Sequence, residues 1–160
     1  MKICLPPKIS RTIICLLFAL VSCDDTTRSS IPDYPVNLER NVFNEPNLQI
    51  LMSPGNYKEF IPTIPPEKIT DRLGFGGLLV LCNMDDYGNL QYFAFDLACP
   101  YEVERETRVT MLNSLQAECA KCGSKFNMGF GTGTCAVGPA KEGLRRYRVA
   151  VSGYNIRVFR

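Results

Sequence analysis

The sequence predicts an all-β domain built of antiparallel strands, and three observations lead to this prediction. No window of the chain keeps an apolar repeat of the helical period. Short apolar or alternating segments recur instead, and Gly, Pro, Asn and Asp separate them. Closely spaced short strands with such turn residues between them are typical of a β sandwich or barrel.

The first half of the predicted domain contains two strand-like segments. Residues 36–43 show mixed alternation and predict a first strand, and residues 48–51 predict another short one. Pro54-Gly55-Asn56 is typical of a turn. Three prolines follow, and because proline donates no hydrogen bond to a sheet they favour an irregular stretch: Pro62, Pro65 and Pro66.

The second half carries the clearer pattern. An apolar run after Gly76-Gly77 and an aromatic run after the turn at residues 85–89 predict a hairpin. Residues 126–135 are rich in glycine and predict a second hairpin with positive-φ positions. The strands expected in this half cover residues 78–82, 90–96, 115–118, 146–151 and 154–159, and the last two close the domain as a hairpin.

The first residues predict export. A basic start, with Lys2, Lys8 and Arg11, precedes nine apolar residues at 13–21, which are too few to span a bilayer as a helix. This layout is typical of a signal peptide, so residues 1–22 are expected to be removed.

The end of that segment, Leu20-Val21-Ser22-Cys23, resembles the lipobox of bacterial lipoproteins. The resemblance implies lipid on Cys23 and a membrane anchor in a bacterial cell envelope, at the outer membrane or a periplasm-facing membrane. More than one acyl chain gives stable anchoring. The alternative is an ordinary secretory signal that contains a cysteine. Residues 23–33 are polar and predict a flexible tether, and residues 34–160 form the predicted β domain.

Charge excludes one class of partner. The whole chain carries 18 basic and 16 acidic residues, and the chain from Cys23 onward carries 15 and 16. A nucleic-acid-binding domain needs a basic surface, and this composition does not predict one. We therefore expect a membrane contact through the lipid and a protein partner, redox or other, that the sequence does not identify.

Cysteine chemistry dominates the rest of the sequence. The chain has eight cysteines and no histidine, so it has no histidine nucleophile, base or metal ligand. Five cysteines remain beyond the signal peptide and the lipid site: Cys82, Cys99, Cys119, Cys122 and Cys135. We predict no catalytic residue and no enzymatic activity.

Two loops carry a family resemblance. Cys99-Pro100-Tyr101 and the segment Cys119 to Phe126, which reads C-A-K-C-G-S-K-F, resemble the two cluster-binding loops of a Rieske iron–sulfur domain, C-x-H and C-x-x-H-G-S-x-F. Gly138-Pro139-Ala140 and the later L-x-x-Y-x-V at residues 144–149 also match that family. The resemblance implies a Rieske-like antiparallel β sandwich or barrel with a two-loop cysteine site.

The resemblance also shows what has changed. It places Cys99 and Cys119 at the two cysteine-ligand positions, and Tyr101 and Cys122 at the two histidine positions. Two histidines on one iron define the Rieske cluster, so the standard [2Fe–2S] cluster is not expected here.

Three interpretations of the altered site stay open. Cys99, Cys119 and Cys122 bind a metal, either zinc or an atypical [2Fe–2S] cluster, with Tyr101, water or Cys135 completing the ligand set. Alternatively the site is empty and oxidised, with a disulfide from Cys99 to Cys119 or to Cys122 that staples the loops. In the third, Cys119 and Cys122 act as a thiol–disulfide pair.

These interpretations predict two functions. The first is a lipid-anchored exported protein whose Rieske-like, electron-transfer-type domain has an atypical or emptied site. The second is a non-catalytic structural or partner-binding lipoprotein with a loop-stapling disulfide. Cys82 is expected to be a buried core thiol.

Overall fold

A computed structural model describes residues 29–160 of the chain, apart from Asp86. The predicted signal peptide, the lipidation of Cys23 and the first part of the tether therefore lie outside the described residues. In the part of the chain that is described, no helix has the length and apolar character needed to cross a bilayer.

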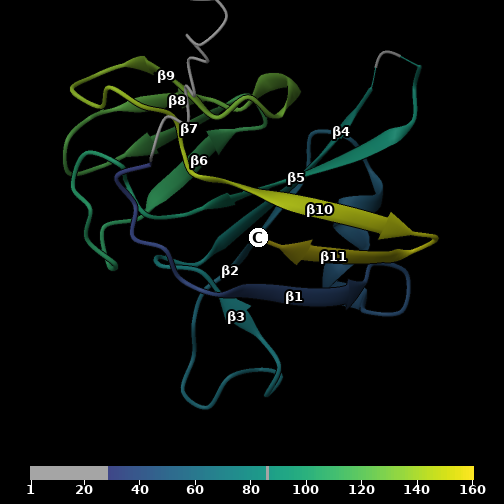
Figure 1. The fold of residues 1–160 in the computed structure, drawn as a ribbon. Helices are drawn as coiled ribbons and strands as arrows, with labels where there is room; N and C mark the ends of the chain where they lie inside the picture. The colour runs from purple at the N-terminus through teal and green to yellow at the C-terminus, as the bar shows by residue number, and fades with distance from the viewer. Residues whose placement is uncertain (1–28, 86) are drawn as a thin grey trace, which may run out of the picture.

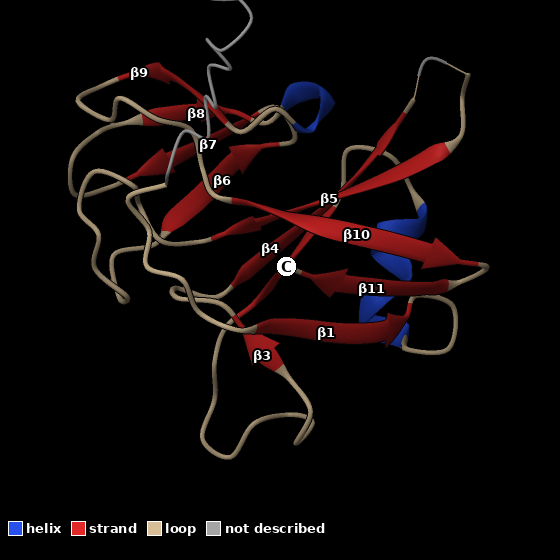
Figure 2. Ribbon diagram, in the orientation of Figure 1, coloured by secondary structure: helices blue, strands red, loops and turns tan. Residues whose placement is uncertain are grey.

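The described chain forms two antiparallel sheets, which confirms the predicted all-β class (Figures 1 and 2). The larger sheet has seven strands in the order β2-β4-β5-β10-β11-β1-β3, and the smaller has four in the order β6-β7-β8-β9. The strands are β1 Val36–Asn41, β2 Tyr57–Phe60, β3 Arg72–Leu73, β4 Leu78–Met84, β5 Leu90–Asp96, β6 Val109–Asn113, β7 Gln116–Cys119, β8 Lys125–Asn127, β9 Thr134–Val137, β10 Arg146–Ser152 and β11 Asn155–Phe159.

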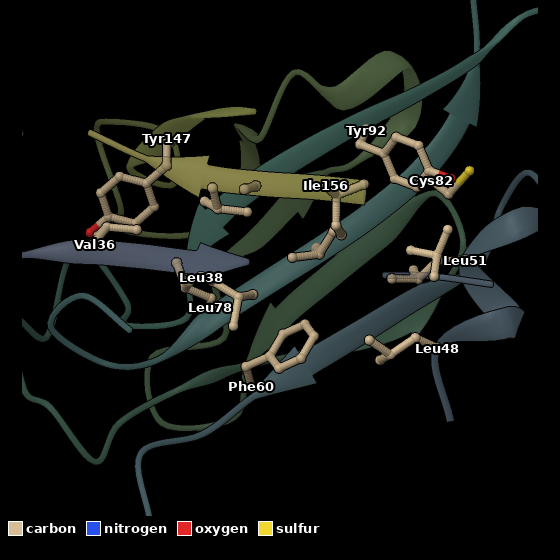
Figure 3. Packing of buried hydrophobic residues seen from close by; sticks show 14 residues of the cluster. Val36, Leu38, Leu48, Leu51, Phe60, Leu78, Cys82, Tyr92, Tyr147 and Ile156 are labelled. Carbon is tan, nitrogen blue, oxygen red and sulfur yellow. The ribbon is translucent and has the colours of Figure 1, made fainter. Parts of the chain in front are cut away.

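The β4–β5 hairpin is the centre of the fold. Its seven residue pairs run from Leu78 opposite Asp96 to Met84 opposite Leu90, as the apolar run and the turn predict. Successive side chains of a strand point to opposite faces, and here both faces are buried. One face packs into a first core of the larger sheet, which Figure 3 shows, and the other into a second core under the smaller sheet.

The second core brings the smaller sheet onto the hairpin. Phe93 and Phe95 of β5 pack in this core with Phe126 and with the cysteines at positions 99 and 119. Gly131 has a φ of 63°, and a Cβ there would lie 2.1 Å from the Phe93 ring. Only glycine fits this approach, so the positive-φ positions predicted for residues 126–135 are confirmed.

The prediction of a strand at residues 48–51 is wrong. The segment Pro46–Met52 is the 3₁₀ helix η2. Pro46 lies in its first turn, where a fixed φ and a missing N–H are tolerated. Leu48 and Leu51 are both buried, and a spacing of three residues places them on one face of a 3₁₀ helix. The short apolar segment is too brief for sequence periodicity to separate a strand from such a helix.

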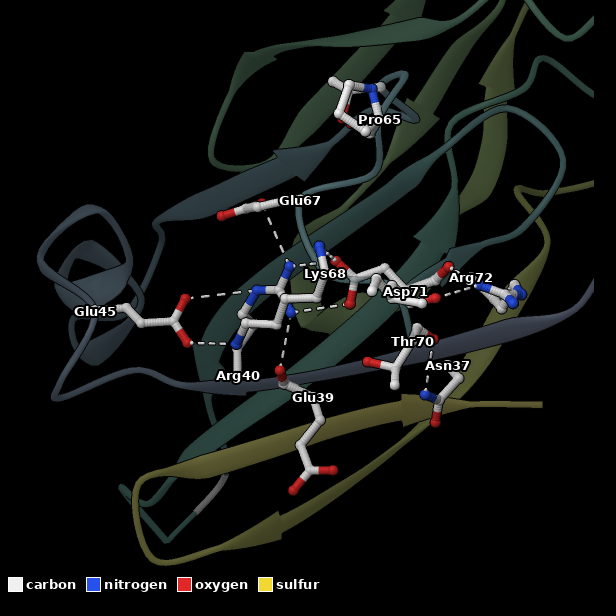
Figure 4. Close-up of polar contacts among 12 residues, drawn as sticks. Asn37, Glu39, Arg40, Glu45, Pro65, Glu67, Lys68, Thr70, Asp71 and Arg72 are labelled. Carbon is white, nitrogen blue, oxygen red and sulfur yellow. Dashed lines mark hydrogen bonds and ion pairs between the residues drawn. The ribbon is translucent and has the colours of Figure 1, made fainter.

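A buried arginine fastens the loop between β2 and β3 (Figure 4). Arg40 of β1 is 2% exposed, and its guanidinium binds both carboxylate oxygens of Asp71 at 3.0 and 2.6 Å. Glu67 and Glu45 approach it at 3.3 and 3.5 Å. Burial by itself lowers the pKa of Arg40, but the bond and charge of Asp71 outweigh it and keep that pKa above its ordinary value.

We expect Asp71→Ala to lower the free energy of unfolding by about 3–5 kcal/mol, because it leaves the buried guanidinium without its main partner. Urea unfolding followed by circular dichroism measures the change. Glu67→Ala is the matched control: its side chain is 61% exposed, so its loss should cost no more than about 0.5 kcal/mol. Equal losses for the two variants would contradict this account of the cluster.

Candidate metal centre

The first cysteine loop, residues 99–108, joins β5 to β6. A bridge between Ala98 and Arg108 closes it, and the Cys99 N–H donates to the Thr107 carbonyl at 3.1 Å. Within the loop, the Val103 N–H donates to the Cys99 carbonyl at 2.9 Å, and Val103 takes a φ of 52°. These bonds fold the loop back on itself directly after Cys99 and set the direction of that side chain.

The second cysteine loop, residues 119–125, joins β7 to β8. Gly123 donates its N–H to the Cys119 carbonyl at 2.8 Å, and the Cys119 N–H donates to the Ser124 carbonyl at 2.9 Å. Gly123 has a φ of 73° with open space where a Cβ would be, so the turn needs glycine for its backbone conformation and not for lack of room. This tight turn points Cys119 and Cys122 the same way.

The structure brings the three predicted site cysteines together. The Sγ atoms of Cys99, Cys119 and Cys122 all lie within 4.8 Å of one another. The Sγ atoms of Cys99 and Cys122 are 3.6 Å apart. Cys99 and Cys119 are fully buried in the second core, whereas Cys122 is half-buried at its edge. The five cysteines among the described residues all carry free thiols.

Polar groups of the loops surround the sulfurs. The hydroxyl of buried Ser124 lies 3.1 Å from the Cys122 Sγ and accepts the Ala140 N–H at 3.1 Å. Burial raises the pKa of Cys99, although the N–H groups of Glu102 and Tyr101 partly offset it. Burial also raises the pKa of Cys122. There, however, the hydrogen bonds with Ser124 outweigh burial and hold that pKa below its ordinary value. The site thus holds donors suited to anionic sulfur.

Two ion pairs connect the loops at the surface. Lys121 of the second loop binds Glu102 and Glu104 of the first at 2.9 and 2.7 Å. The side chains of Glu104 and Lys121 are about half exposed, so the pairs hold the loops together in a salt-sensitive way. The local sequence pattern does not predict these ion pairs, because nothing in it links the two loops.

A buried carboxylate positions the first loop. Asp96, the last residue of β5, is fully buried and accepts hydrogen bonds from the N–H groups of Phe75, Gly76 and Ala98 at 2.8–2.9 Å. The Tyr147 hydroxyl donates the fourth at 2.8 Å. Asp96 therefore ties the entry to the first loop to the segment before β4 and to β10. An acidic residue at the end of an apolar strand was the available signal for this anchor.

The other candidate ligands lie elsewhere. Tyr101 is 55% exposed, so its ring lies at the surface of the first loop. Cys135 is not part of the group of three, and its Sγ contacts the Val137 carbonyl at 3.5 Å. Cys82 is fully buried in the first core, as predicted. Three of the five cysteines therefore form the site, and the structure assigns no fourth protein ligand among them.

Comparisons with known proteins give matches among solved structures, including two ferredoxin-related chains. A chain from a complex of reduced oxygenase and oxidized ferredoxin in carbazole 1,9a-dioxygenase is 19% identical, with 78% of this chain and 93% of that chain covered and a TM-score of 0.45. The ferredoxin of carbazole 1,9a-dioxygenase from Nocardioides aromaticivorans IC177 is 20% identical, with 78% and 96% covered and a TM-score of 0.43. No protein-family model and no curated protein matches the chain.

The residues do not fit the histidine-ligated cluster that the Rieske resemblance implies. The sequence contains no histidine, and the two positions hold exposed Tyr101 and half-buried Cys122. One pair of the three sulfurs has the spacing that a single ion would require. Zinc–sulfur bonds of about 2.3 Å in a tetrahedron place the sulfurs about 3.8 Å apart, close to the 3.6 Å between Cys99 and Cys122.

We expect Asp96→Ala to lower the free energy of unfolding by at least about 3 kcal/mol, because three N–H groups, two of them buried, lose their acceptor. Tyr147→Phe removes only one of the four bonds and should cost about 1–2 kcal/mol. Urea titration of both variants in reducing, chelator-containing buffer measures the difference without a contribution from metal. A loss for Asp96→Ala no larger than that for Tyr147→Phe would show that the carboxylate does not organise these segments.

Proposed function

We propose that this protein is a lipid-anchored exported protein whose Rieske-like β domain binds one thiophilic metal ion through Cys99, Cys119 and Cys122. The observation that carries the proposal is the meeting of three sulfurs from two loops within 4.8 Å. The domain has no proposed catalytic residue, and its role is to hold the ion for exchange or for electron transfer with a partner protein. Bound iron or copper would supply one-electron chemistry, and bound zinc a cross-link between the loops.

The environment of the sulfurs supports a metal centre. Ligand cysteines must be thiolates, and an anionic sulfur in a buried site needs hydrogen-bond donors. Tyr101 and Glu102 offer N–H groups to Cys99, Ser124 offers its N–H to Cys122, and the Ser124 hydroxyl lies 3.1 Å from the Cys122 Sγ. Disulfide sulfur carries no such charge, so these donors favour thiolate ligation. Beyond the three cysteines, water or a ligand from a partner would complete the coordination of the ion.

A second candidate function rests on one distance. The Sγ atoms of Cys99 and Cys122, 3.6 Å apart, need only a small approach to reach the S–S bond length of about 2.05 Å. An exported protein meets oxidising conditions, which favour this bond. The domain would then be a non-catalytic scaffold for a binding partner, with a disulfide between the two loops.

Metal content separates the two functions. Protein purified without air should contain about one zinc, iron or copper ion per chain, measured by elemental mass spectrometry, because three thiolates and one open position suit a single ion. Cys99→Ser, Cys119→Ser and Cys122→Ser should each lose the ion, whereas Cys135→Ser, the matched control, should keep it.

Metal-free wild-type protein would contradict the first function. In that case the second candidate function, a non-catalytic scaffold, predicts a Cys99–Cys122 disulfide, which mass spectrometry of peptides would detect. Cys99→Ser should then lower the free energy of unfolding by about 2–4 kcal/mol in non-reducing buffer only.

The lipid anchor has its own test. Expressed in a bacterium with its full signal segment, the protein should fractionate with membranes and carry the mass of acyl chains on the peptide that begins at Cys23. Cys23→Ser should move it to the soluble fraction, because the acyl chains supply the stable membrane affinity. Membrane association unchanged by Cys23→Ser would contradict lipidation at this residue.

A further inference from the structure

The described chain begins beside the metal centre. The Ser30 hydroxyl donates to the carbonyl of Pro100 at 2.7 Å, and the Ser30 N–H donates to Glu142 at 2.8 Å. Pro100 is the residue directly after Cys99, so Ser30 lies against the first cysteine loop. The N-terminal segment therefore joins the domain at the loop that carries a site ligand.

The residues that follow are packed on the domain. Ile31 is 1% exposed. Arg145 donates to the Ile31 carbonyl at 2.7 Å and pairs with Asp33 at 2.7 Å, and Arg160 also pairs with Asp33. The predicted tether of residues 23–33 thus includes, in its described part, a segment held in place. The chain from Cys23 to Ser29 is the only length left to separate a lipid from the domain.

That length is short. Six residue steps join Cys23 to Ser29, and at no more than about 3.6 Å each they reach at most about 22 Å when fully extended. We propose that the lipid anchor holds the face formed by the two cysteine loops against the lipid headgroups of its own membrane. This inference rests on the lipid anchor of the proposed function, and it adds the direction in which the metal centre faces.

The chemistry of the face suits a headgroup layer. The Lys121 ammonium lies between Glu102 and Glu104 and pairs with both carboxylates, so this group carries only one net negative charge. Tyr101 in the first loop is 55% exposed, and its amphipathic ring is of the kind that settles at a membrane–water interface. The half-buried Cys122 opens on this same face. Access to the site is then from the membrane side.

The opposite end of the domain gives a reference point. Strand β10 leads away from the smaller sheet to the turn before β11, at the far side of the molecule in Figure 1. Ser152, the last residue of β10 before that turn, is exposed. A residue there stays open to the solvent when the cysteine loops face the bilayer.

Thiol labelling tests the orientation. The lipidated full-length protein with Cys135→Ser is bound to vesicles of phosphatidylethanolamine and phosphatidylglycerol, reduced, and stripped of metal by a chelator. The rate of labelling by a maleimide with a long polyethylene glycol chain then measures the accessibility of Cys122, because the other three thiols are buried: Cys82, Cys99 and Cys119. Labelling should be several-fold slower than for a Cys23→Ser form mixed with the same vesicles.

Two further variants complete the test. A flexible insertion of about twenty Gly and Ser residues between Arg28 and Ser29 lengthens the reach, and it should restore fast labelling on vesicles. In a background with Cys122→Ser and Cys135→Ser, Ser152→Cys should label equally fast with and without the lipid. Slow labelling that returns to the fast rate with the long tether supports the inference.

The failures are distinguishable. If the protein binds vesicles but Cys122 is labelled equally fast with the short and the long tether, the orientation is wrong and the lipid anchor stands. The face would then be open to a partner from the aqueous phase. Protein that does not float with the vesicles would overturn the lipid anchor, and the inference with it. Because labelling uses metal-free protein, the metal proposal is decided separately by metal content.

Discussion

The carboxylate of Asp96 is the constraint on which the rest of the structure depends. It ends the central strand β5 in a fully buried position, and it satisfies donors from three separate segments, including the Tyr147 hydroxyl. Without that acceptor, the segment before β4, the start of the first cysteine loop and β10 would each bury an unpaired donor, and unpaired buried donors are costly. The position of Cys99, three residues later, follows from this anchor, so the geometry of the site begins with a residue that does not touch it.

The site is a part of the second core and not an addition to the surface. Cys99 and Cys119 pack among the apolar side chains under the smaller sheet, so their sulfurs are fixed by the same contacts that fix the sheet. Cys122 stands at the edge and is the only member of the three with access to solvent. This difference in burial gives the three thiols unequal roles. Two are held by packing, and the third is held by Ser124 and can respond to a ligand from outside.

Much of the fold was predictable from local pattern, and the exceptions have physical causes. The β4–β5 hairpin and the closing hairpin follow from apolar runs and turn residues, and the structure confirms them within two residues at each end. The 3₁₀ helix at residues 46–52 was missed because its two buried leucines are too few to define a period. At the site, the family resemblance led to the three cysteines, since spacing alone does not show which of five thiols meet. The pairing of Lys121 with the first loop depends on tertiary contact, which no local pattern carries.

The β4–β5 hairpin also determines how the protein unfolds. Leu78 and Val80 face the first core, while Leu79 and Leu81 face the second, so each core includes one face of the same pair of strands. If one sheet unfolded while the other stayed native, apolar side chains of the shared hairpin would become exposed to water. Folding is therefore expected to be a single cooperative event for both sheets, and formation of the cysteine site is coupled to the folding of strands far from it. A destabilising mutation in the larger sheet is therefore expected to lower the fraction of molecules in which the cysteine site is folded.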